Sequence, residues 1–210
     1  MADWDYGGAW RRHDMSGEIH LPHDSVVAAH DITHGLPEFM RRADAIFVDP
    51  PCSQGNLRSF HTKAGQALPY SFGDFERSLF QRIDEIGPRN LFVELFKSNM
   101  TGFMDAIKRR YPFVTVYDSF YYNKRGNRCW IAHASTGACP ALPIDNIDEA
   151  KAIQWITANV DFDCIGDLCM GLGTLGWHAY QSGRQFVGTE LNPKRLAVLV
   201  DKIRSAESDR

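Results

Sequence analysis

Short apolar runs recur along the chain and are separated by polar or glycine-containing segments. Runs of about four to eight residues that are rich in β-branched and aromatic side chains are typical of buried strands. On this basis the sequence predicts seven strands, at residues 26–30, 45–48, 91–96, 114–122, 129–134, 164–169 and 185–189.

Segments with helical periodicity lie between these runs. Residues 75–86 place Phe75, Leu79 and Ile83 on one face, and a Gly-Pro pair ends the pattern. Because strands and helices alternate, we expect an α/β fold with a mostly parallel sheet. The strands at 114–122 and 129–134 flank a short basic turn, which predicts an antiparallel hairpin. Further helices are predicted at residues 36–42, 101–110, 148–160 and 177–182.

The length fits one domain with one core, since the chain has 210 residues, of which 44% are hydrophobic. We assign residues 25–205 to this domain. Residues 1–24 have a mixed composition that includes Trp4 and Trp10, and we expect them to form a partly ordered N-terminal arm. A net charge of −3 excludes the global basic field of a strong nonspecific nucleic-acid binder, so any such site must be a local patch.

Cysteine and histidine usage argues against disulfides and metal. The five cysteines are odd in number and contain no C-x-x-C pair, which is typical of reduced thiols in a cytoplasmic protein. No apolar run is long enough to span a membrane, and the N-terminus has no signal-peptide pattern. Five histidines between residues 13 and 34 lack a convincing ligand spacing, so we expect no metal. The cysteines are at positions 52, 129, 139, 164 and 169.

A glycine-punctuated turn follows the strand at 164–169. It reads Gly171-Leu172-Gly173-Thr174-Leu175-Gly176 and is followed by a helical segment and a second strand that ends at Glu190. Glycines let a ligand approach the backbone at a helix N-terminus, and a carboxylate at the next strand end can accept both hydroxyls of a ribose. The turn therefore indicates a nucleoside pocket, although glycines at such a position also serve helix–sheet packing alone.

A second motif, Asp49-Pro50-Pro51-Cys52, comes directly after the strand at 45–48. The carboxyl end of a parallel strand is where open α/β sheets place their ligands. Two consecutive prolines remove two backbone donors and keep the chain extended. The motif therefore predicts a rigid loop that presents a carboxylate and a free carbonyl oxygen. As an alternative, Asp-Pro-Pro serves only to end the strand.

The two motifs together resemble those of the S-adenosylmethionine-dependent DNA amino-methyltransferases. The resemblance rests on Asp-Pro-Pro at 49–51, Asp-x-x-x-Gly-x-Gly-Thr at 167–174 and Glu-Leu-Asn-Pro at 190–193, and it covers most of residues 25–200. In the beta arrangement of this family the catalytic motif precedes the cofactor motif, as it does here. The resemblance implies a Rossmann-like class I methyltransferase fold, circularly permuted, with a seven-stranded, mostly parallel sheet and an antiparallel hairpin at one edge. It also implies methyl transfer from S-adenosylmethionine to adenine N6 or cytosine N4 of DNA.

The resemblance also implies which residues hold the cofactor. Glu190 would hold the ribose hydroxyls, Leu191 the adenine, and Asp167 with the glycine turn the sugar and methionine side. Asp31 matches a family acidic residue near the adenosine, but Asp-x-Thr is also ordinary capping chemistry. The implied set is Asp31, Asp167, Cys169, Gly171, Gly173, Thr174, Glu190 and Leu191.

The implied catalytic residues are Asp49, Pro50, Pro51 and Cys52. Hydrogen bonds to Asp49 and to the Pro50 carbonyl would orient an amino group toward the methyl carbon. Cys52 departs from the family, which has an aromatic residue there to stack on the target base. Phe60, Tyr70 and Phe72 are the candidates to replace that aromatic. A rival interpretation makes Cys52 a thiolate nucleophile, as in cytosine-C5 chemistry, but that family has no preceding Asp-Pro and uses the reverse motif order.

Nucleic-acid contacts are predicted in two basic segments. Residues 53–72 have loop composition and are expected to form a mobile lid or a DNA-contacting loop. The interval before the cofactor motif leaves no room for a sizeable target-recognition domain, so we expect low sequence specificity. A homodimer is a further expectation, while RNA or another planar acceptor, and a non-catalytic cofactor-binding subunit, are alternatives. The predicted contacts are Arg58 and Lys63, and Lys124, Arg125 and Arg128 of the hairpin.

Overall fold

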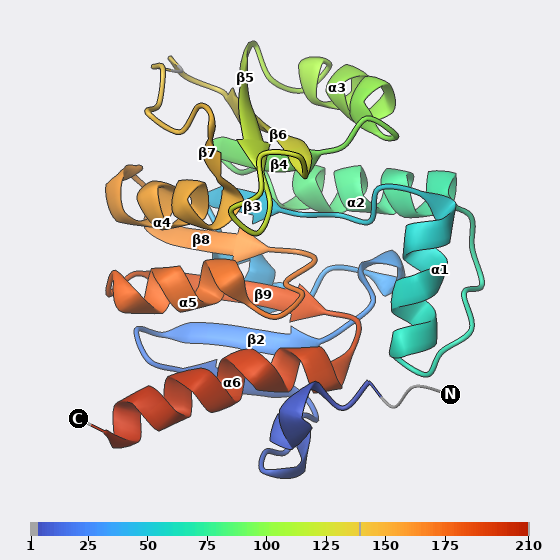
Figure 1. The fold of residues 1–210 in the computed structure, drawn as a ribbon, viewed down its shortest axis with the longest axis vertical. Helices are drawn as coiled ribbons and strands as arrows, with labels where there is room; N and C mark the ends of the chain where they lie inside the picture. The colour runs from blue at the N-terminus through green and yellow to red at the C-terminus, as the bar shows by residue number, and fades with distance from the viewer. Residues whose placement is uncertain (1–3, 139, 210) are drawn as a thin grey trace.

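A single nine-stranded mixed sheet organises the computed structural model, which describes residues 4–138 and 140–209 (Figure 1). The strand order is β1-β2-β9-β8-β3-β4-β6-β5-β7. The strands are β1 (Glu18–Leu21), β2 (Ser25–Ala29), β3 (Ala45–Val48), β4 (Asn90–Leu95), β5 (Phe113–Phe120), β6 (Arg128–Ser135), β7 (Ile147–Asp148), β8 (Cys164–Asp167) and β9 (Gln185–Glu190).

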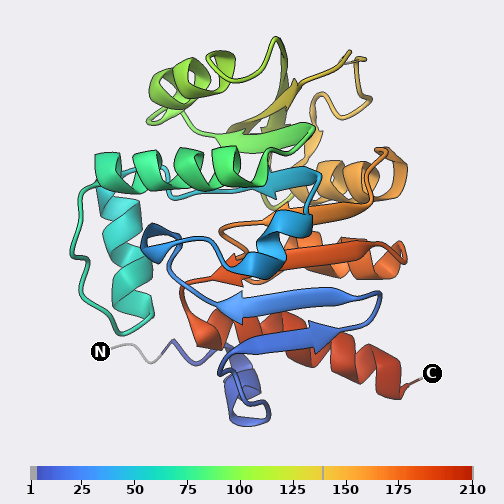
Figure 2. The same cartoon turned by 180° about the vertical axis from the view of Figure 1, so that it is seen from behind.

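Helices cover both faces of this sheet. Figure 1 shows α4, α5 and α6 on one face, and the view from behind in Figure 2 shows α2 on the other. One buried cluster lies on each side, as expected for a sheet between two helical layers. The helices are α1 (Gln54–Lys63), α2 (Phe72–Ile86), α3 (Met100–Lys108), α4 (Glu149–Asn159), α5 (Thr174–Gln181) and α6 (Pro193–Ser208), with short 3₁₀ helices at Tyr6–Arg11, Ile32–His34 and Glu38–Arg42.

The five central strands run parallel, so their carboxyl ends meet at one edge. β2 pairs with β9, β9 with β8, β8 with β3 and β3 with β4, all in parallel register. The chain passes from β8 to β9 on one side and from β3 to β4 on the other, so the strand order reverses between β8 and β3. Such a switch point leaves a crevice beyond the strand ends, where open α/β sheets bind ligands.

The predicted α/β class and the hairpin are confirmed, but the sheet has nine strands and not seven. β5 and β6 pair antiparallel from Phe113↔Ser135 to Phe120↔Arg128. β1 pairs antiparallel with β2, and β7 contributes two residues beside β5. Both were missed because β1 buries only Ile19 and Leu21 between polar neighbours and β7 is too short for any periodicity.

The predicted N-terminal arm is largely part of the fold. Besides β1, the segment contains the 3₁₀ helix Tyr6–Arg11, which packs against α6. Arg12 pairs with Asp201 of α6 at 2.6 Å. The Trp10 indole donates to Asp5 and lies beneath Lys194, whereas Trp4 is 48% exposed. Contacts with the distant helix α6 order this segment, and the local sequence does not reveal such contacts.

The observed helices differ from the predictions at three further places. Residues 53–72, expected to be a loop, contain α1, which Ser53 caps by accepting from the Asn56 N–H and which buries Leu57 and His61. The polar composition of α1 hid it, because its buried stripe is only two residues. Residues 36–42 form a 3₁₀ helix in place of an α-helix. α6 was not predicted, although Asn192 caps it and Pro193 occupies its first turn.

Among the described helices, none is long and apolar enough to cross a membrane. Cys52, Cys129, Cys164 and Cys169 carry free thiols, and Cys139 lies outside the described residues.

Candidate functional site

A cavity of about 260 Å³ opens at the carboxyl edge of the parallel strands. Residues from both sequence motifs line it, although they are more than a hundred positions apart in the chain. Pro50, Cys52 and Gly173 are the predicted motif residues that do not contribute to the lining. Those that do are Asp31, Asp49, Pro51, Asp167, Cys169, Gly171, Thr174, Glu190 and Leu191.

The glycine turn is shaped by backbone conformation and by two carboxylates. Gly171 and Gly173 have φ values of 58° and 82°, which side chains rarely adopt. A Cβ at Gly173 would lie 2.6 Å from the Cβ of Leu199, so Gly173 lets α6 approach the turn, although it does not face the cavity. Asp167 accepts from the Cys169 N–H at 2.8 Å, and burial raises its pKa well above the usual value.

Glu190 is buried at the end of β9 and is held from both sides. Its Oε2 accepts from the Gly171 N–H at 2.7 Å, and its Oε1 accepts from the Asn192 N–H at 3.0 Å. The Arg195 guanidinium lies 3.8 Å from Oε1. Burial raises the pKa of Glu190, while Arg195 and the two backbone hydrogen bonds oppose the rise. Because each oxygen has a second lone pair, the carboxylate can still accept from a ligand with two neighbouring hydroxyl groups.

Asp31 caps a helix and also faces the cavity. Its Oδ1 accepts from the Thr33 N–H at 2.9 Å, which confirms the capping interpretation. Its Oδ2 accepts from the Tyr70 hydroxyl at 3.0 Å, and that hydroxyl also contacts His61 Nε2 at 2.8 Å. These contacts fix the carboxylate on the wall that α1 provides.

α1 forms a wall of the cavity. Leu57, Phe60 and His61 of this helix line it, as does Tyr70 from the following segment. The Asn192 side chain donates to the Lys63 carbonyl at 3.0 Å, which ties the end of α1 to the start of α6. The segment expected to form a mobile lid is therefore a docked helix.

Asp49 follows β3 and lines the cavity, which is open enough to leave this residue exposed. The Tyr121 hydroxyl donates to Asp49 Oδ1 at 3.5 Å. The surrounding protein disfavours the charged form and raises the pKa of Asp49 to about 6, although Arg195 and Tyr121 oppose the rise. A group with this pKa is ionised at neutral pH but exchanges protons readily.

Cys52 supports the loop through its backbone. Its N–H donates to Asn56 Oδ1 at 3.1 Å, and its carbonyl accepts from the Ser98 hydroxyl at 3.0 Å. Since the side chain does not line the cavity, a thiolate nucleophile at Cys52 has no support from the geometry. The two backbone hydrogen bonds of Cys52 therefore help to hold the Asp-Pro-Pro loop in place.

Aromatic side chains reach the cavity from other elements. Of the three predicted replacements, Phe60 and Tyr70 line it, whereas Phe72 packs against Phe75 and Phe103. Two tyrosines after β5 were not predicted for this role. Tyr121 and Tyr122 both line the cavity, and Tyr122 is 82% exposed at its mouth.

Two glutamates that the sequence analysis missed join Asp49. Glu149 begins α4 and lines the cavity, and burial, with the charges of Asp49 and Asp148, raises its pKa to about 7. Glu94 of β4 is fully buried. A charged residue inside the apolar run 91–96 was the available signal, because such residues are rarely buried without a reason.

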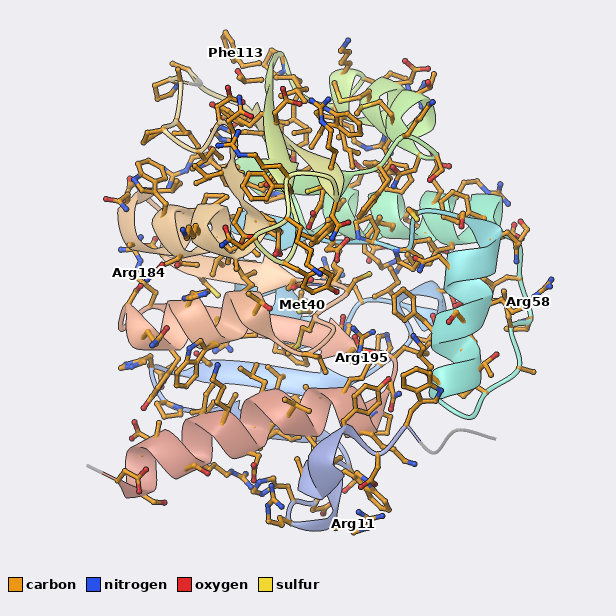
Figure 3. The ribbon with its side chains drawn as sticks, in the orientation of Figure 1. Arg11, Met40, Arg58, Phe113, Arg184 and Arg195 are labelled. Carbon is orange, nitrogen blue, oxygen red and sulfur yellow. The ribbon has the colours of Figure 1, made fainter. Side chains whose placement is uncertain are left out.

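The predicted cations lie outside the cavity lining. Arg58 projects outward from α1, whereas Arg195 lies at the inner side near the start of α6 (Figure 3). Lys63 covers the Trp4 ring at 4.6 Å, and Arg128 pairs with Asp118 at 3.2 Å. Lys124 and Arg125 are exposed in the hairpin turn. Arg195, not among the predicted cations, lines the cavity and stacks on Phe60 at 4.9 Å.

No metal site is evident in the part of the chain that the structure describes, where no three His, Cys, Asp or Glu side chains converge suitably. The acidic and basic side chains that line the cavity are five carboxyl groups, one guanidinium and two imidazoles. Such a lining suits a ligand that presents hydroxyl or amino donors.

The fold is that of solved DNA methyltransferases. M1.HpyAVI in complex with S-adenosylmethionine matches with a TM-score of 0.56 and 10% identity over 84% of this chain and 98% of that one. TTHA0409 from Thermus thermophilus, complexed with S-adenosyl-L-methionine, matches with a TM-score of 0.58 and 12% identity over 85% of this chain and 94% of that one. The cytosine-N4-specific PvuII DNA methyltransferase matches with a TM-score of 0.56 and 12% identity over 89% of this chain and 90% of that one. No family model and no curated protein sequence matches the chain.

Proposed function

We propose that this protein transfers a methyl group from S-adenosylmethionine to the exocyclic amino group of adenine (N6) or cytosine (N4) in DNA. One observation carries the proposal: Asp49 after β3 and Glu190 with the glycine turn of β8 and β9 line a single cavity. The shared fold with structures solved in complex with S-adenosylmethionine supports the same assignment. The strand that bears Asp-Pro-Pro precedes the glycine-turn strand in the chain, which fits the circularly permuted arrangement.

The cavity residues fit this cofactor. Glu190 keeps free lone pairs for the ribose hydroxyls, and Gly171, with its positive φ, lines the cavity without a side chain. Asp31 and Leu191 would contact the adenine side, and Asp167, Cys169 and Thr174 the sugar and methionine side. When bound, the cofactor supplies an electrophilic methyl group attached to a sulfonium.

Asp49 would orient the acceptor nitrogen and take its proton. An exocyclic amino group is a poor nucleophile because its lone pair is delocalised into the ring. A hydrogen bond to Asp49, which lines the cavity, would direct that lone pair at the methyl carbon. On methylation the nitrogen would become cationic, and the Asp49 carboxylate would accept the proton that it releases.

Tyr122 is proposed to stack on the target base in place of the missing aromatic at position 52. It is the exposed aromatic at the mouth, next to Tyr121, whose hydroxyl contacts Asp49. A base must leave the duplex to reach Asp49, and stacking contributes about 1–3 kcal/mol per base. Phosphates would be contacted by Lys124 and Arg125 of the hairpin and by Arg58 and Lys63 of α1.

DNA incubated with the protein and a methyl-labelled cofactor is expected to yield labelled N6-methyladenine or N4-methylcytosine, measured by mass spectrometry of nucleosides. The Asp105→Ala variant is a matched control, because Asp105 is an exposed carboxylate on α3 outside the cavity. It should retain the activity of the wild type. Absence of label from both methylated nucleosides of the DNA contradicts the proposal.

Low sequence specificity is part of the same proposal. The segment between β6 and β7 is too short for a recognition domain, so few side chains can read base edges, each contributing about 1–3 kcal/mol. Long-read sequencing of the methylated DNA should show contexts of about one to three bases. A strict motif of about five base pairs or more, methylated by this chain alone, would contradict it.

The rate is expected to fall with acidity below about pH 6 to 7. Asp49 can take the proton from the amino nitrogen only as a carboxylate. Its pKa is raised to about 6, and that of Glu149 in the same cavity is raised to about 7. Activity is therefore present above these values and lost as pH falls through them. Because the two groups interact, the midpoint in kcat/KM belongs to the pair. A kcat/KM that stays level down to about pH 5 would exclude this role for Asp49.

A further inference from the structure

The sheet places a second carboxyl group, Glu94, directly beside Asp49. β3 and β4 are parallel and pair Phe47 with Phe92 and Val48 with Val93, so Asp49 and Glu94 come next in register. The rings of Phe47 and Phe92 stack with centroids 6.3 Å apart on one face. Residues two positions further along a strand point to the same face. Asp49 and Glu94 are therefore neighbours on adjacent strands, which lie about 4.8 Å apart.

Burial outweighs the two groups that would stabilise a negative charge on Glu94, the Tyr121 hydroxyl and the Cys129 thiol. The Glu94 side chain is completely buried, and among the described residues neither carboxyl oxygen has a hydrogen-bond partner within bonding geometry. Burial of an unpaired carboxylate is so costly that such a group takes up a proton instead. Asp49 from β3 and Glu149 from α4 add like charge, and together with burial they raise the pKa of Glu94 well above its usual value.

The other polar groups that face this pair are weak acids and one cation. Tyr121, after β5, faces Asp49 and Glu94, and Cys129 of β6 faces Glu94. Arg195 of α6 acts on Asp49. Asp167, the last residue of β8, and Glu149 are further carboxyl groups that interact with the charge of Asp49.

Resting on the proposed function, we propose that Glu94 is a positioning residue: as a buried carboxylic acid, it donates a hydrogen bond to the Tyr121 hydroxyl, which donates to Asp49. The second link is the contact from Tyr121 to Asp49 Oδ1 at 3.5 Å. The Tyr121 ring is held in place by stacking on Phe96, with centroids 5.5 Å apart and planes 6° apart. The chain of hydrogen bonds occupies one oxygen of Asp49 and leaves the other for the acceptor amino group.

This arrangement separates the roles of the two acids. Glu94 already holds a proton, so it cannot take the proton that the nitrogen releases, and that proton goes to Asp49 and on to solvent. A donor aimed at an ionised carboxylate stabilises its charged form and lowers its pKa. Glu94 thereby keeps Asp49 ionised among several other carboxyl groups. A protonated carboxyl kept as a hydrogen-bond donor is known chemistry in apolar enzyme sites.

Two substitutions at Glu94 test the donor. Glu94→Gln keeps a donor of the same shape, whereas Glu94→Met has similar volume and no donor. We expect Glu94→Gln to retain kcat within about threefold, and Glu94→Met to lose about tenfold or more with little change in KM for DNA. The acid limb of kcat/KM should move to higher pH in Glu94→Met only. If Glu94→Gln is as impaired as Glu94→Met, Glu94 must ionise and the proposal is overturned.

Tyr121→Phe tests the connecting hydroxyl. It should reproduce the kinetic defect and the shifted acid limb of Glu94→Met. Combining the two substitutions should add little further loss, because both break one hydrogen-bonded chain. Fully additive losses would show that Glu94 acts on something other than Tyr121 and Asp49.

A measurement that needs no activity separates this proposal from the proposed function. Carbon-13 NMR of labelled Asp and Glu carboxyl groups, in protein without cofactor, gives the titration of Asp49 and Glu94. The Asp49 pKa should rise by about one unit in Glu94→Met and Tyr121→Phe but stay level in Glu94→Gln. Ionisation of Glu94 below about pH 7, or an unchanged Asp49 in all variants, overturns the proposal. If these shifts in the Asp49 pKa are present but no methyl transfer occurs, the proposed reaction is contradicted and the role of Glu94 is not.

Discussion

Replacing Asp49 with alanine is expected to lower kcat for methyl transfer by about a hundredfold or more and to leave S-adenosylmethionine affinity nearly unchanged. Asp49 lies on the β3 side of the cavity, while Glu190 and the glycine turn come from β8 and β9. Its role is to orient the amino group and accept a proton, and positioned proton acceptors contribute about 10²–10⁴-fold. Single-turnover kinetics with saturating cofactor, beside calorimetry of cofactor binding, gives both quantities.

The Asp105→Ala variant controls for removal of a carboxylate as such. Retention of more than about a tenth of the activity by Asp49→Ala would correspond to less than about 1.4 kcal/mol of transition-state stabilisation. That is too little for an essential acceptor, and the assignment of Asp49 would then be wrong. A large loss of cofactor affinity would instead place Asp49 in the binding site.

Replacing Glu190 with alanine is expected to weaken S-adenosylmethionine binding by about 1.5–3 kcal/mol, or roughly ten- to 150-fold. Two effects contribute, because the carboxylate would accept the ribose hydroxyls and already holds the Gly171 and Asn192 N–H groups at 2.7 and 3.0 Å. Charge-assisted hydrogen bonds of this kind are about twice as strong as neutral ones. Isothermal titration calorimetry measures the change directly.

A matched control is Glu38→Ala, since the Glu38 side chain is 88% exposed and lies outside the cavity. Thermal unfolding without cofactor separates the two effects. If Glu190 mainly supports the glycine turn, the melting temperature of Glu190→Ala falls, and affinity falls with it. Cofactor affinity equal to that of the wild type would mean that the pocket is assigned to the wrong strand end.

The parallel core and both motifs were predictable because their signals are local. The apolar runs at β3 and β8 are each bounded by residues that break a strand, the Asp-Pro-Pro loop and the glycine turn. A strand that ends in such a turn must present the next side chains at the sheet edge, whatever surrounds it. Asp49 and Glu190 could therefore be chosen from the sequence as cavity residues.

Strands and helices that form only through contacts with residues distant in the sequence could not be predicted in this way. β1 has a partner only because β2 offers an open edge, and α1 forms from a polar sequence because Leu57 and His61 dock beside the cavity. Long-range contacts of this kind override local propensity. The same holds for the loop cysteine at position 52, whose side chain direction follows from backbone contacts to Asn56 and Ser98.

The sequence by itself determined the α/β class, the hairpin and the two motif carboxylates at strand ends. The tertiary structure alone decided which other charges join them, because strand register brings Glu94 beside Asp49 and helix packing brings Glu149 and Arg195 to the same cavity. Their effect depends on burial and mutual distance, which no local pattern records. The raised pKa values of Asp49 and Glu149 are thus properties of the assembled fold.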